Sequence, residues 1–528
     1  MSRSRVPRLR AATAIIAAAL LGTALVACSP GEGGGSATPK AEVLNLQFVG
    51  SPVSLNPALA ATGGSTPYVH LAYDPLIYMD GEGNLVPDLA VSWEFITDDN
   101  TVFEMKLREG VTFASGKPFD ANAAKASMDY FLGAGGNMIR QVGPIEKIEA
   151  VDETTLRVTY SAPFPNAAMT MTQYYQIGAI IGPDGLADPD SLLTKSDGTG
   201  QYIFDAEETI TDSVYVYKKN PEYWAPDAQV FEVIKMNVIQ DPNAAIAALT
   251  TGQVDFAHGG TATAESAKSA GLDIVRAPYY ISTLQILDRG GELNPALGDE
   301  RVRQAIQMAM DRPALIAAAS SPDYAVENGQ VVNEGAPGWI KGLGEEYDIE
   351  RAKELLAEAG YPDGFTMVIG TTPAMDPQSI LTQAIATNLA EIGITAEIVV
   401  ESTGLPRLLE RSELKELESM VLPVTGYDVA AAVATIRDRP NLNPWGVTDA
   451  EIDRLINESM VSSGADRVAI LEQLNERANE VVWVAPVFSE DNLYYVAPTI
   501  TNVKASSGNP NPVPIGPERK YAWQPAEG

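Results

Sequence analysis

Between residues 299 and 400 the sequence alternates between helical and strand patterns, and this alternation restricts the fold more than any other feature. Asp299, Asp348 and Ser379 each precede a segment whose apolar residues recur every three or four positions, as on the buried face of a helix. The stretch FTMVIG and residues 394–400 are short runs rich in apolar and β-branched residues, which predict strands. Helices that alternate with strands indicate an α/β domain in which helices cover the faces of a sheet.

The chain before residue 260 has a different pattern, mainly of strands and turns. Residues 101–108 (TVFEMKLR) alternate between apolar and polar side chains, and Asp120 is placed to cap a following helix. Around Asp241 and Pro242 a predicted strand gives way to a helix. Residues 80–84 (DGEGN) are similar to a calcium-binding loop but lack its register and its final glutamate, so we interpret them as a hairpin turn. A chain of 528 residues is too long for one hydrophobic core, so two or three domains are expected.

The charge balance argues against one class of partner. The sequence has 69 acidic and 36 basic residues and a net charge of −33, so it lacks the positive surface that nucleic acid requires. We interpret the acidity as a means of staying soluble. The single cysteine cannot form an intramolecular disulfide, so apolar burial must supply the stability.

Residues 1–27 have the features of an export signal. Four arginines and no acid precede an uncharged, alanine-rich run that is short for a membrane span. The sequence LVAC at residues 25–28 resembles a bacterial lipobox, in which the cysteine is acylated and becomes the new N-terminus. Cys28 is therefore predicted to carry lipid, and an ordinary signal peptide with an incidental cysteine is the alternative. Residues 28–40 are rich in Gly, Ser and Pro and predict a flexible tether.

The residues most used in catalysis are scarce. His70 and His258 are the only histidines, and neither lies in a zinc-binding motif. The sequence has no nucleophile elbow and no phosphate-binding loop, and we expect no cofactor. Because acidic residues are abundant, a carboxylate pair of the kind that hydrolyses glycosides remains open. Catalysis is nevertheless the less favoured hypothesis.

A series of segments matches, in order, the motifs of one known family. The segments are SLNPALA (54–60), YDPLIYMDGEGNLVPDLAVSWEF (73–95), FEMKLREGVTFASGKPFDA (103–121), DGTGQYIF (197–204), NPEYWAP (220–226), DPNAAIAALTTGQVDFA (241–257), DERVRQAIQMAMDRPALI (299–316), YDIERAKELLAEAGYPDGF (347–365) and EIDRLINES (451–459). They resemble the bacterial extracytoplasmic solute-binding proteins of the oligopeptide, dipeptide and nickel class. Members of that family serve ATP-binding-cassette (ABC) importers.

This resemblance implies an α/β, two-lobed periplasmic-binding-protein fold of the class II type, in which the lobes close on the ligand. The implied parts are lobe I at 41–277 and 488–528, an extra subdomain within it at about 66–195, lobe II at 278–487, and crossings at 278–280 and 486–488. The implied partners are a small-molecule or peptide ligand, with a peptide-like solute favoured, and the permease subunits of an ABC importer. We expect a monomer that contacts the membrane only through its lipid, on the outer face.

The candidate ligand site departs from the pattern of the peptide-binding members. Peptide-binding members often have a W-x-x-D-Y-x-D-P motif in lobe II, whose aspartate holds the α-amino group of the ligand. The corresponding residues 420–438 (MVLPVTGYDVAAAVATIRD) lack the tryptophan and the final D-P. The resemblance implies that Tyr427 and Asp428 face the ligand, where Asp428 could pair with a cation. The alternative is that Asp428 only caps the helix that follows it.

Four further residues are candidate ligand contacts. Trp445 would stack on a sugar or an apolar side chain, or else pack in a core. Arg437 would meet a ligand carboxylate, or else face water. Tyr279 and Tyr280 would line the hinge side of the cleft, and one of them must point into a core if both lie on a regular strand. Two histidines are too few for a multi-histidine nickel site. A secreted hydrolase and an anchored sensor or adhesion module remain as alternative functions.

Overall fold

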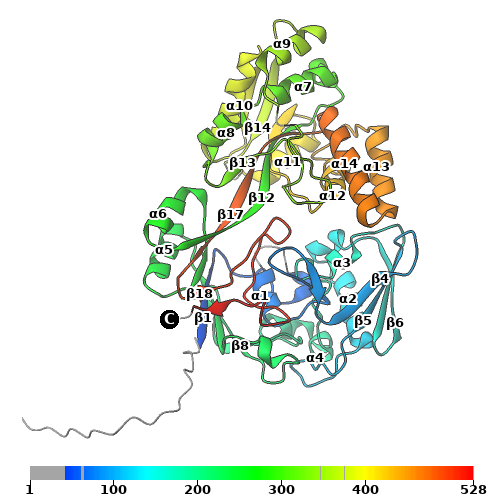
Figure 1. Ribbon diagram of the computed structural model, residues 1–528, viewed down its shortest axis with the longest axis vertical. Helices are drawn as coiled ribbons and strands as arrows, with labels where there is room; N and C mark the ends of the chain where they lie inside the picture. Colours follow the sequence, from blue (N-terminus) through cyan, green and yellow to red (C-terminus); the bar gives the residue numbers. More distant parts are fainter. Residues whose placement is uncertain (1–41, 61–64, 345, 374, 527–528) are drawn as a thin grey trace, which may run out of the picture. The chain divides into compact units, whose positions relative to one another are not determined.

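A mixed β-sheet of eleven strands runs through the part of the chain that the structure describes (Figure 1). The structure is a computed structural model, and it describes residues 42–60, 65–344, 346–373 and 375–526. In order across the sheet, the strands are β15 (Thr395–Val400), β14 (Thr366–Thr371), β16 (Ser419–Val421), β12 (Asp273–Ile286), β17 (Ala485–Val496), β11 (Phe256–His258), β1 (Val43–Phe48), β10 (Val233–Val238), β9 (Val214–Lys219) and β8 (Tyr202–Ile210), and β13 (Ala325–Glu327) pairs with β17.

The two long strands β12 and β17 lie at the middle of the sheet. They are antiparallel, and their pairing runs from Asp273 opposite Val496 to Leu284 opposite Ala485. The register shifts twice along β12, between Pro278 and Tyr280 and between Ser282 and Thr283. Such shifts mark bulges, which bend a strand. The segments expected to cross between lobes, 278–280 and 486–488, both lie in these strands. We name the elements on the β11 side the first lobe and those on the β16 side the second lobe.

The first lobe combines the β1 side of the sheet with short helices and with the C-terminal segment. Strand β1 is parallel to β10 and β11. The core of this lobe includes Ile515 and Trp523 from the end of the chain, because the last residues return to pack against β11 and β17. The other elements here are α1 (Thr66–His70), α3 (Ala167–Thr170), α4 (Pro183–Ala187), α5 (Pro242–Thr250), α6 (Ala264–Ser269), β18 (Ile500–Thr501) and β19 (Gln524–Pro525).

A separate antiparallel sheet forms part of the first lobe and has its own core. Its strand order is β4 (Ala90–Phe95), β5 (Val102–Leu107), β7 (Thr155–Tyr160) and β6 (Ile145–Asp152), and α2 (Ala121–Gly133) packs against it. Phe103, Met105 and Leu107 are buried on one face of β5, as the alternating sequence predicts. Residues 80–84 form the predicted hairpin turn between β2 (Ile77–Met79) and β3 (Leu85–Pro87).

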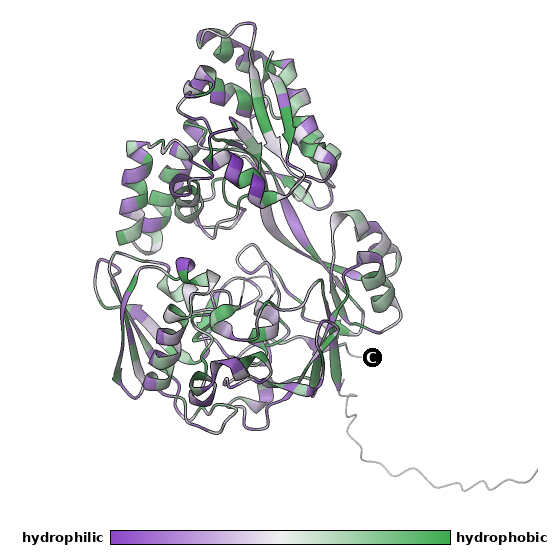
Figure 2. Ribbon diagram, turned by 180° about the vertical axis from the view of Figure 1, so that it is seen from behind, coloured by the Kyte–Doolittle hydropathy of each residue, from purple (hydrophilic) through white to green (hydrophobic). Residues whose placement is uncertain are grey.

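The second lobe has the alternating α/β structure that the sequence predicts. Figure 2 shows helices whose hydrophilic and hydrophobic residues lie on different faces around the strands of this lobe. Helix α7, for example, buries Val302, Ala305 and Ile306. The helices of this lobe are α7 (Glu300–Met308), α8 (Arg312–Ala319), α9 (Ile349–Glu358), α10 (Ile380–Glu391), α11 (Leu405–Glu413), α12 (Val429–Asp438), α13 (Ala450–Val461) and α14 (Gly464–Glu480).

Three of the four predicted helix caps are confirmed, and one is wrong. Asp120, Asp299 and Asp348 accept backbone N–H groups at the first turns of α2, α7 and α9. Asp241 does the same at the first turn of α5. Ser379 does not cap α10, because Gln378 and Ser379 form a left-handed turn with φ angles of 59° and 56°. Asp376 lies before this turn and accepts the N–H groups of Leu381 at 3.0 Å and Thr382 at 2.9 Å instead.

The predicted export signal (1–27), the tether (28–40) and Cys28 lie outside the described residues. Their predictions therefore stay predictions. Within the described ranges, none of the helices combines the length and the apolar character that a membrane span requires.

Candidate functional site

Tyr279 and Tyr280 lie side by side on the hinge strand β12. Their ring centroids are 4.3 Å apart in an edge-to-face arrangement. Tyr279 falls at the register shift, where the strand bulges. The bulge interrupts the regular alternation of side chains, so neither ring is fully buried and 44% of Tyr280 is exposed. The expectation that one of the two points into a core holds only for a regular strand, and it is wrong here.

Asn333 fixes the backbone of this hinge. Its amide donates a hydrogen bond to the carbonyl oxygen of Tyr279 at 3.1 Å, and the hydroxyl of Ser489 on β17 donates to its side-chain oxygen. One side chain therefore joins both hinge strands beside the two tyrosines. Burial raises the pKa of Tyr279, so its hydroxyl stays protonated at neutral pH.

Asp428 has two structural partners in the second lobe. Its carboxylate accepts the Ala431 N–H at 2.7 Å, and so caps α12, and it forms an ion pair with Arg467 at 2.7 Å. Only 1% of Asp428 is exposed. The capping role that the sequence left open is therefore present. The negative charge already has a cationic partner of its own chain.

Tyr427, the neighbour of Asp428, reaches the first lobe. The amide of Asn166, just before α3, donates a hydrogen bond to the Tyr427 hydroxyl at 3.1 Å. The residue is 37% exposed, and its partial burial together with the charge of Asp428 raises the pKa of Tyr427. Tyr427 is thus a hydrogen-bonding group at the contact between the lobes.

Two first-lobe tyrosines, which the sequence analysis missed, lie close to these residues. The Tyr174 hydroxyl donates to the side-chain oxygen of Asn509 at 3.1 Å and accepts the backbone N–H of Asn511 at 3.0 Å. The ring of Tyr175 lies beside that of Tyr174, with centroids 6.5 Å apart, and burial is the main cause that raises the pKa of Tyr175. The only sequence feature that could have indicated them is the pair of adjacent tyrosines in YYQ at 174–176.

Arg437 and Trp445 have other surroundings. Arg437 forms ion pairs with Asp438 at 2.6 Å and Asp453 at 3.0 Å. It lies in the last turn of α12, about 14 Å along the helix from Asp428. Trp445 is partly buried and packs against a second-lobe core, with the ammonium of Lys415 5.7 Å from its ring centroid.

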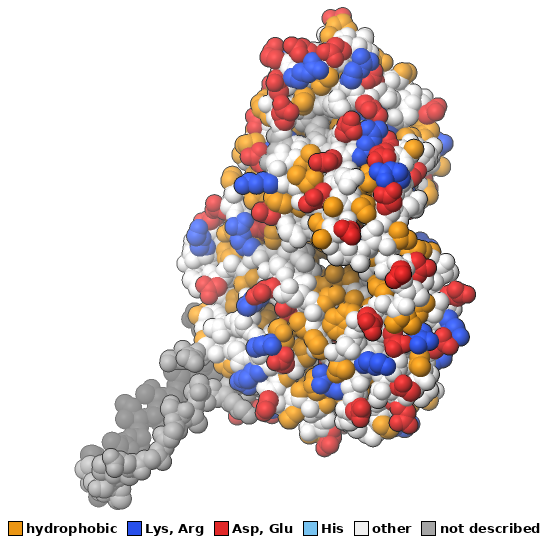
Figure 3. Space-filling model, turned by 45° about the vertical axis from the view of Figure 1, so that its right-hand side comes forward, with side chains coloured by type: hydrophobic (Ala, Val, Ile, Leu, Met, Phe, Trp, Pro, Cys, Tyr) orange, Lys and Arg blue, Asp and Glu red, His pale blue; other side chains and the backbone are white. Residues whose placement is uncertain are grey.

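The structure therefore brings together tyrosines from both lobes and from the hinge. Figure 3 shows hydrophobic side chains, a class that includes tyrosine, gathered at a hollow between the two lobes. Phenol rings offer flat faces and hydroxyl groups, and the asparagines beside them offer amide donors and acceptors. Such a set can hold a polar organic molecule.

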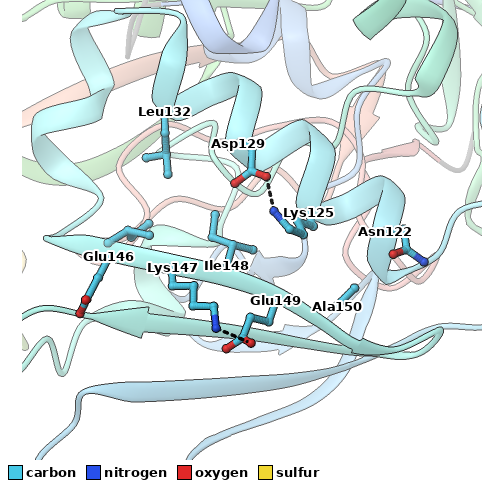
Figure 4. A pocket seen from close by; sticks show the side chains of 10 residues that line it. Asn122, Lys125, Asp129, Leu132, Glu146, Lys147, Ile148, Glu149 and Ala150 are labelled. Atoms are coloured by element: carbon cyan, nitrogen blue, oxygen red, sulfur yellow. Dashed lines mark hydrogen bonds and ion pairs between the residues drawn. The ribbon is translucent and has the colours of Figure 1, made fainter.

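A second hollow, of about 490 Å³, lies between α2 and β6 (Figure 4). Its charged side chains pair with each other, Lys125 with Asp129 and Lys147 with Glu149. It is an open surface groove in which four of the five charged side chains are paired, and Glu146 is the fifth. In the described ranges, no group of three or more His, Cys, Asp or Glu side chains is arranged to hold a metal ion.

Comparison with known proteins places the chain in a family. Residues 84–421 match the family model described as "Bacterial extracellular solute-binding proteins, family 5 Middle". The chain belongs to this family. A second similarity is to the glutathione-binding protein GsiB of Shigella flexneri serotype 5b (strain 8401), which is 29% identical over 340 residues. This match covers 63% of the chain and 64% of the length of that relative.

Solved structures show the same fold as this family 5 solute-binding protein. HbpA2 from Haemophilus parasuis superimposes with a TM-score of 0.79 at 21% identity, over 88% of this chain and 98% of the other. DppA from Helicobacter pylori, in complex with the peptide STSA, has a TM-score of 0.69 at 22% identity, over 92% and 98%. At these identities the likeness concerns the fold alone. The two-lobed α/β fold expected from the sequence is confirmed.

Proposed function

We propose that this family 5 protein is the lipid-anchored receptor of an ABC importer. It binds a small solute between its lobes and delivers the solute to the permease in the membrane. The observation that carries the proposal is the hydrogen bond between Asn166 of the first lobe and Tyr427 of the second, in a protein whose hinge strand presents the paired rings of Tyr279 and Tyr280. A ligand that contacts both lobes favours the closed arrangement of the lobes, because it gains contacts that neither lobe supplies alone.

The favoured ligand is a peptide or a peptide-like solute. Tyrosine hydroxyls and asparagine amides complement the N–H and C=O groups of a peptide backbone. The names of two relatives, a glutathione-binding protein and a structure with a bound peptide, agree with this class. We assign Tyr279, Tyr280 and Tyr427 as ligand contacts and Asp428 as the support of Tyr427. Arg437 and Trp445 stay predictions.

A binding role without turnover fits the histidines. Burial lowers the pKa of His70 and of His258 to about 4, so both are neutral at pH 7. His70 stacks on Tyr78, and His258 packs among Phe48, Phe256 and Tyr494. His70 is buried and His258 is partly buried, and both rings pack against aromatic side chains of the first lobe.

The experiment that tests the receptor role is native mass spectrometry of the protein purified without denaturant. We expect one retained small solute per chain, released intact on unfolding. Tyr427→Phe should weaken rebinding of that solute about tenfold, since one hydrogen bond to the ligand or to Asn166 is lost. Tyr361→Phe is the matched control, because Tyr361 packs on Phe365 in the second lobe. A solute that emerges chemically changed would instead indicate an enzyme.

The anchor has its own test. Replacing Cys28 by Ala should leave the protein unprocessed or release it from the membrane fraction, because the thiol that accepts lipid is gone. A Cys28→Ala protein that is still processed at the same site and still sediments with membranes would contradict the lipid anchor. It would leave the receptor role intact.

A further inference from the structure

Asn100 is buried although it lies at the tip of a turn. It follows β4 and precedes β5, and its φ angle of 55° is in the left-handed region that asparagine tolerates well. Its carbonyl oxygen accepts the N–H of Phe164 at 3.0 Å, which fixes the turn within the first lobe. Only 5% of Asn100 is exposed. Turn tips normally face water, so this burial calls for a partner outside the turn.

The partner is the C-terminal end of α13 in the second lobe. The Asn100 amide nitrogen donates to the carbonyl oxygen of Met460 at 3.1 Å and to that of Ser462 at 3.3 Å. The last carbonyl groups of a helix have no donor within the helix, so they need donors from elsewhere. Here the donor belongs to a residue some 360 positions away, on the other lobe.

A chain of polar contacts links this end of α13 to the candidate ligand site. Arg467 donates to the Ser459 carbonyl oxygen at 3.1 Å and pairs with Asp428 at 2.7 Å. Asp428 adjoins Tyr427, whose hydroxyl accepts the amide of Asn166 from the first lobe. The first lobe thus contacts this part of the second lobe through two asparagine amides, one at each end of the polar chain.

We propose that Asn100 is a positioning residue that latches the lobes together and so sets ligand affinity without touching the ligand. The inference rests on the proposed closure of the lobes around a solute. When the lobes open, the hydrogen bonds to Met460 and Ser462 must break. They therefore stabilise only the closed form. A ligand that needs the closed form binds more weakly when that form is less populated. Loss of both bonds should lower the closed-to-open ratio about tenfold.

The test measures distances between the lobes in the ligand-free protein. Cys28 is the only cysteine, so Cys28→Ser leaves a background into which a pair of spin labels can be placed at Glu153→Cys and Glu472→Cys. Both positions are exposed, one on each lobe. Retained solute is removed by unfolding in guanidinium, dialysis and refolding. Pulsed electron spin resonance then gives the fractions of closed and open molecules.

Two variants and one control are compared. Asn100→Gly removes the amide and keeps the left-handed turn. Asn100→Asp keeps the size but places a carboxylate against the negative end of α13. Asn502→Gly is the matched control, because Asn502 also has a left-handed φ angle and donates to two carbonyl groups, those of Lys520 and Ala522, within the first lobe alone.

We expect the fraction of open molecules to be highest in Asn100→Asp and second highest in Asn100→Gly. In Asn502→Gly it should equal that of the parent protein. Identical distance distributions for Asn100→Gly and the parent would overturn the latch, and so would equal opening in Asn502→Gly. Thermal unfolding of each variant verifies that it is folded. Glutathione and trialanine are then added to the parent as probes together with the solute that mass spectrometry identifies. If none of the three compounds changes the distance between the spin labels in the parent protein, the proposed function is contradicted. The latch is tested separately, by comparing the variants without ligand.

Discussion

At the residue scale, Asp428 shows that a charged side chain next to a candidate ligand site can have a structural role. Its carboxylate holds both the first turn of α12 and the guanidinium of Arg467, and it is almost fully buried. A buried carboxylate without such partners would destabilise the folded protein. The helix N–H group and Arg467 together offset this cost. Through Arg467, which also donates to the Ser459 carbonyl oxygen, Asp428 is connected to the end of α13, where the first lobe makes contact.

This arrangement predicts a loss of stability when Asp428 is changed. Asp428→Ala removes a helix cap and leaves Arg467 without its buried partner, so the free energy of unfolding should fall by about 3 kcal/mol. Asp241→Ala, which removes only the cap of α5, should cost about 1 kcal/mol. Denaturant titration of both variants measures the difference. Equal losses would contradict a structural role for the ion pair.

A second residue-scale prediction concerns two buried acids of the first lobe. Asp74 accepts hydrogen bonds from Trp224 at 3.1 Å and Thr199 at 3.2 Å, while one carboxylate oxygen of Asp88 has no partner. Burial raises the pKa of Asp74 to about 7 and that of Asp88 well above its usual range, and Arg108 offsets this only in part.

The sign of the pH effect follows from these raised pKa values. The folded protein keeps protons that the unfolded chain releases, so the free energy of unfolding should fall as pH rises from about 4 through about 7. Asp88→Asn should remove part of this slope and stabilise the protein by roughly 1–3 kcal/mol at pH 8. Calorimetry at pH 4.5 and pH 8 tests this. A variant whose pH slope equals that of the parent would refute it.

At the element scale, α10 shows that the cap of a helix need not be the residue next to it. Asp376 reaches across the left-handed turn at Gln378 and Ser379 to the first N–H groups of the helix. We expect Asp376→Ala to cost about 1–2 kcal/mol and Ser379→Ala to cost almost nothing. Thermal unfolding of the two variants distinguishes them. A larger loss from Ser379→Ala would restore the cap predicted from the sequence.

The same comparison explains how far sequence reasoning reaches. Asp120, Asp299 and Asp348 were found because a cap and its helix are neighbours in the sequence, and the ordered motifs predicted the fold as a whole. Asp376 was missed because a left-handed turn of Gln378 and Ser379 leaves no signal in residue type. Tyr279 and Tyr280 were located, but the bulge that turns their rings together was not, since it depends on pairing with β17.

The contact between the lobes was beyond the reach of the sequence for a different reason. Asn100 and Asn166 look like ordinary turn residues, and their partners lie some 360 and 261 positions away. A local pattern cannot indicate such a pairing. The candidate site was therefore predicted on the second lobe and at the hinge, while its first-lobe half was not.

At the scale of the whole molecule, the first lobe depends on the last residues of the chain. Trp523 is buried, and its ring centroid lies 4.7 Å from that of Phe256 on β11. Trp523→Ala should therefore lower the free energy of unfolding by about 3–5 kcal/mol. Trp445→Ala, which changes a partly buried side chain, should cost less. Hydrogen exchange should place the loss of protection in the first lobe, and a loss confined to the second lobe would contradict this account.

The second lobe is inserted between β12 and β17, two adjacent strands of one sheet, and this sets the order in which the protein can be completed. As the chain lengthens from its N-terminus, every residue of α7–α14 is available before β17 and Trp523 are made. The helices of the second lobe can therefore form while the first lobe still lacks a central strand, although the second-lobe core is complete only when Ala485, Val487 and Phe488 of β17 are made. The first lobe, which contains the first described strand, β1, is therefore also the lobe that receives the last one, β19.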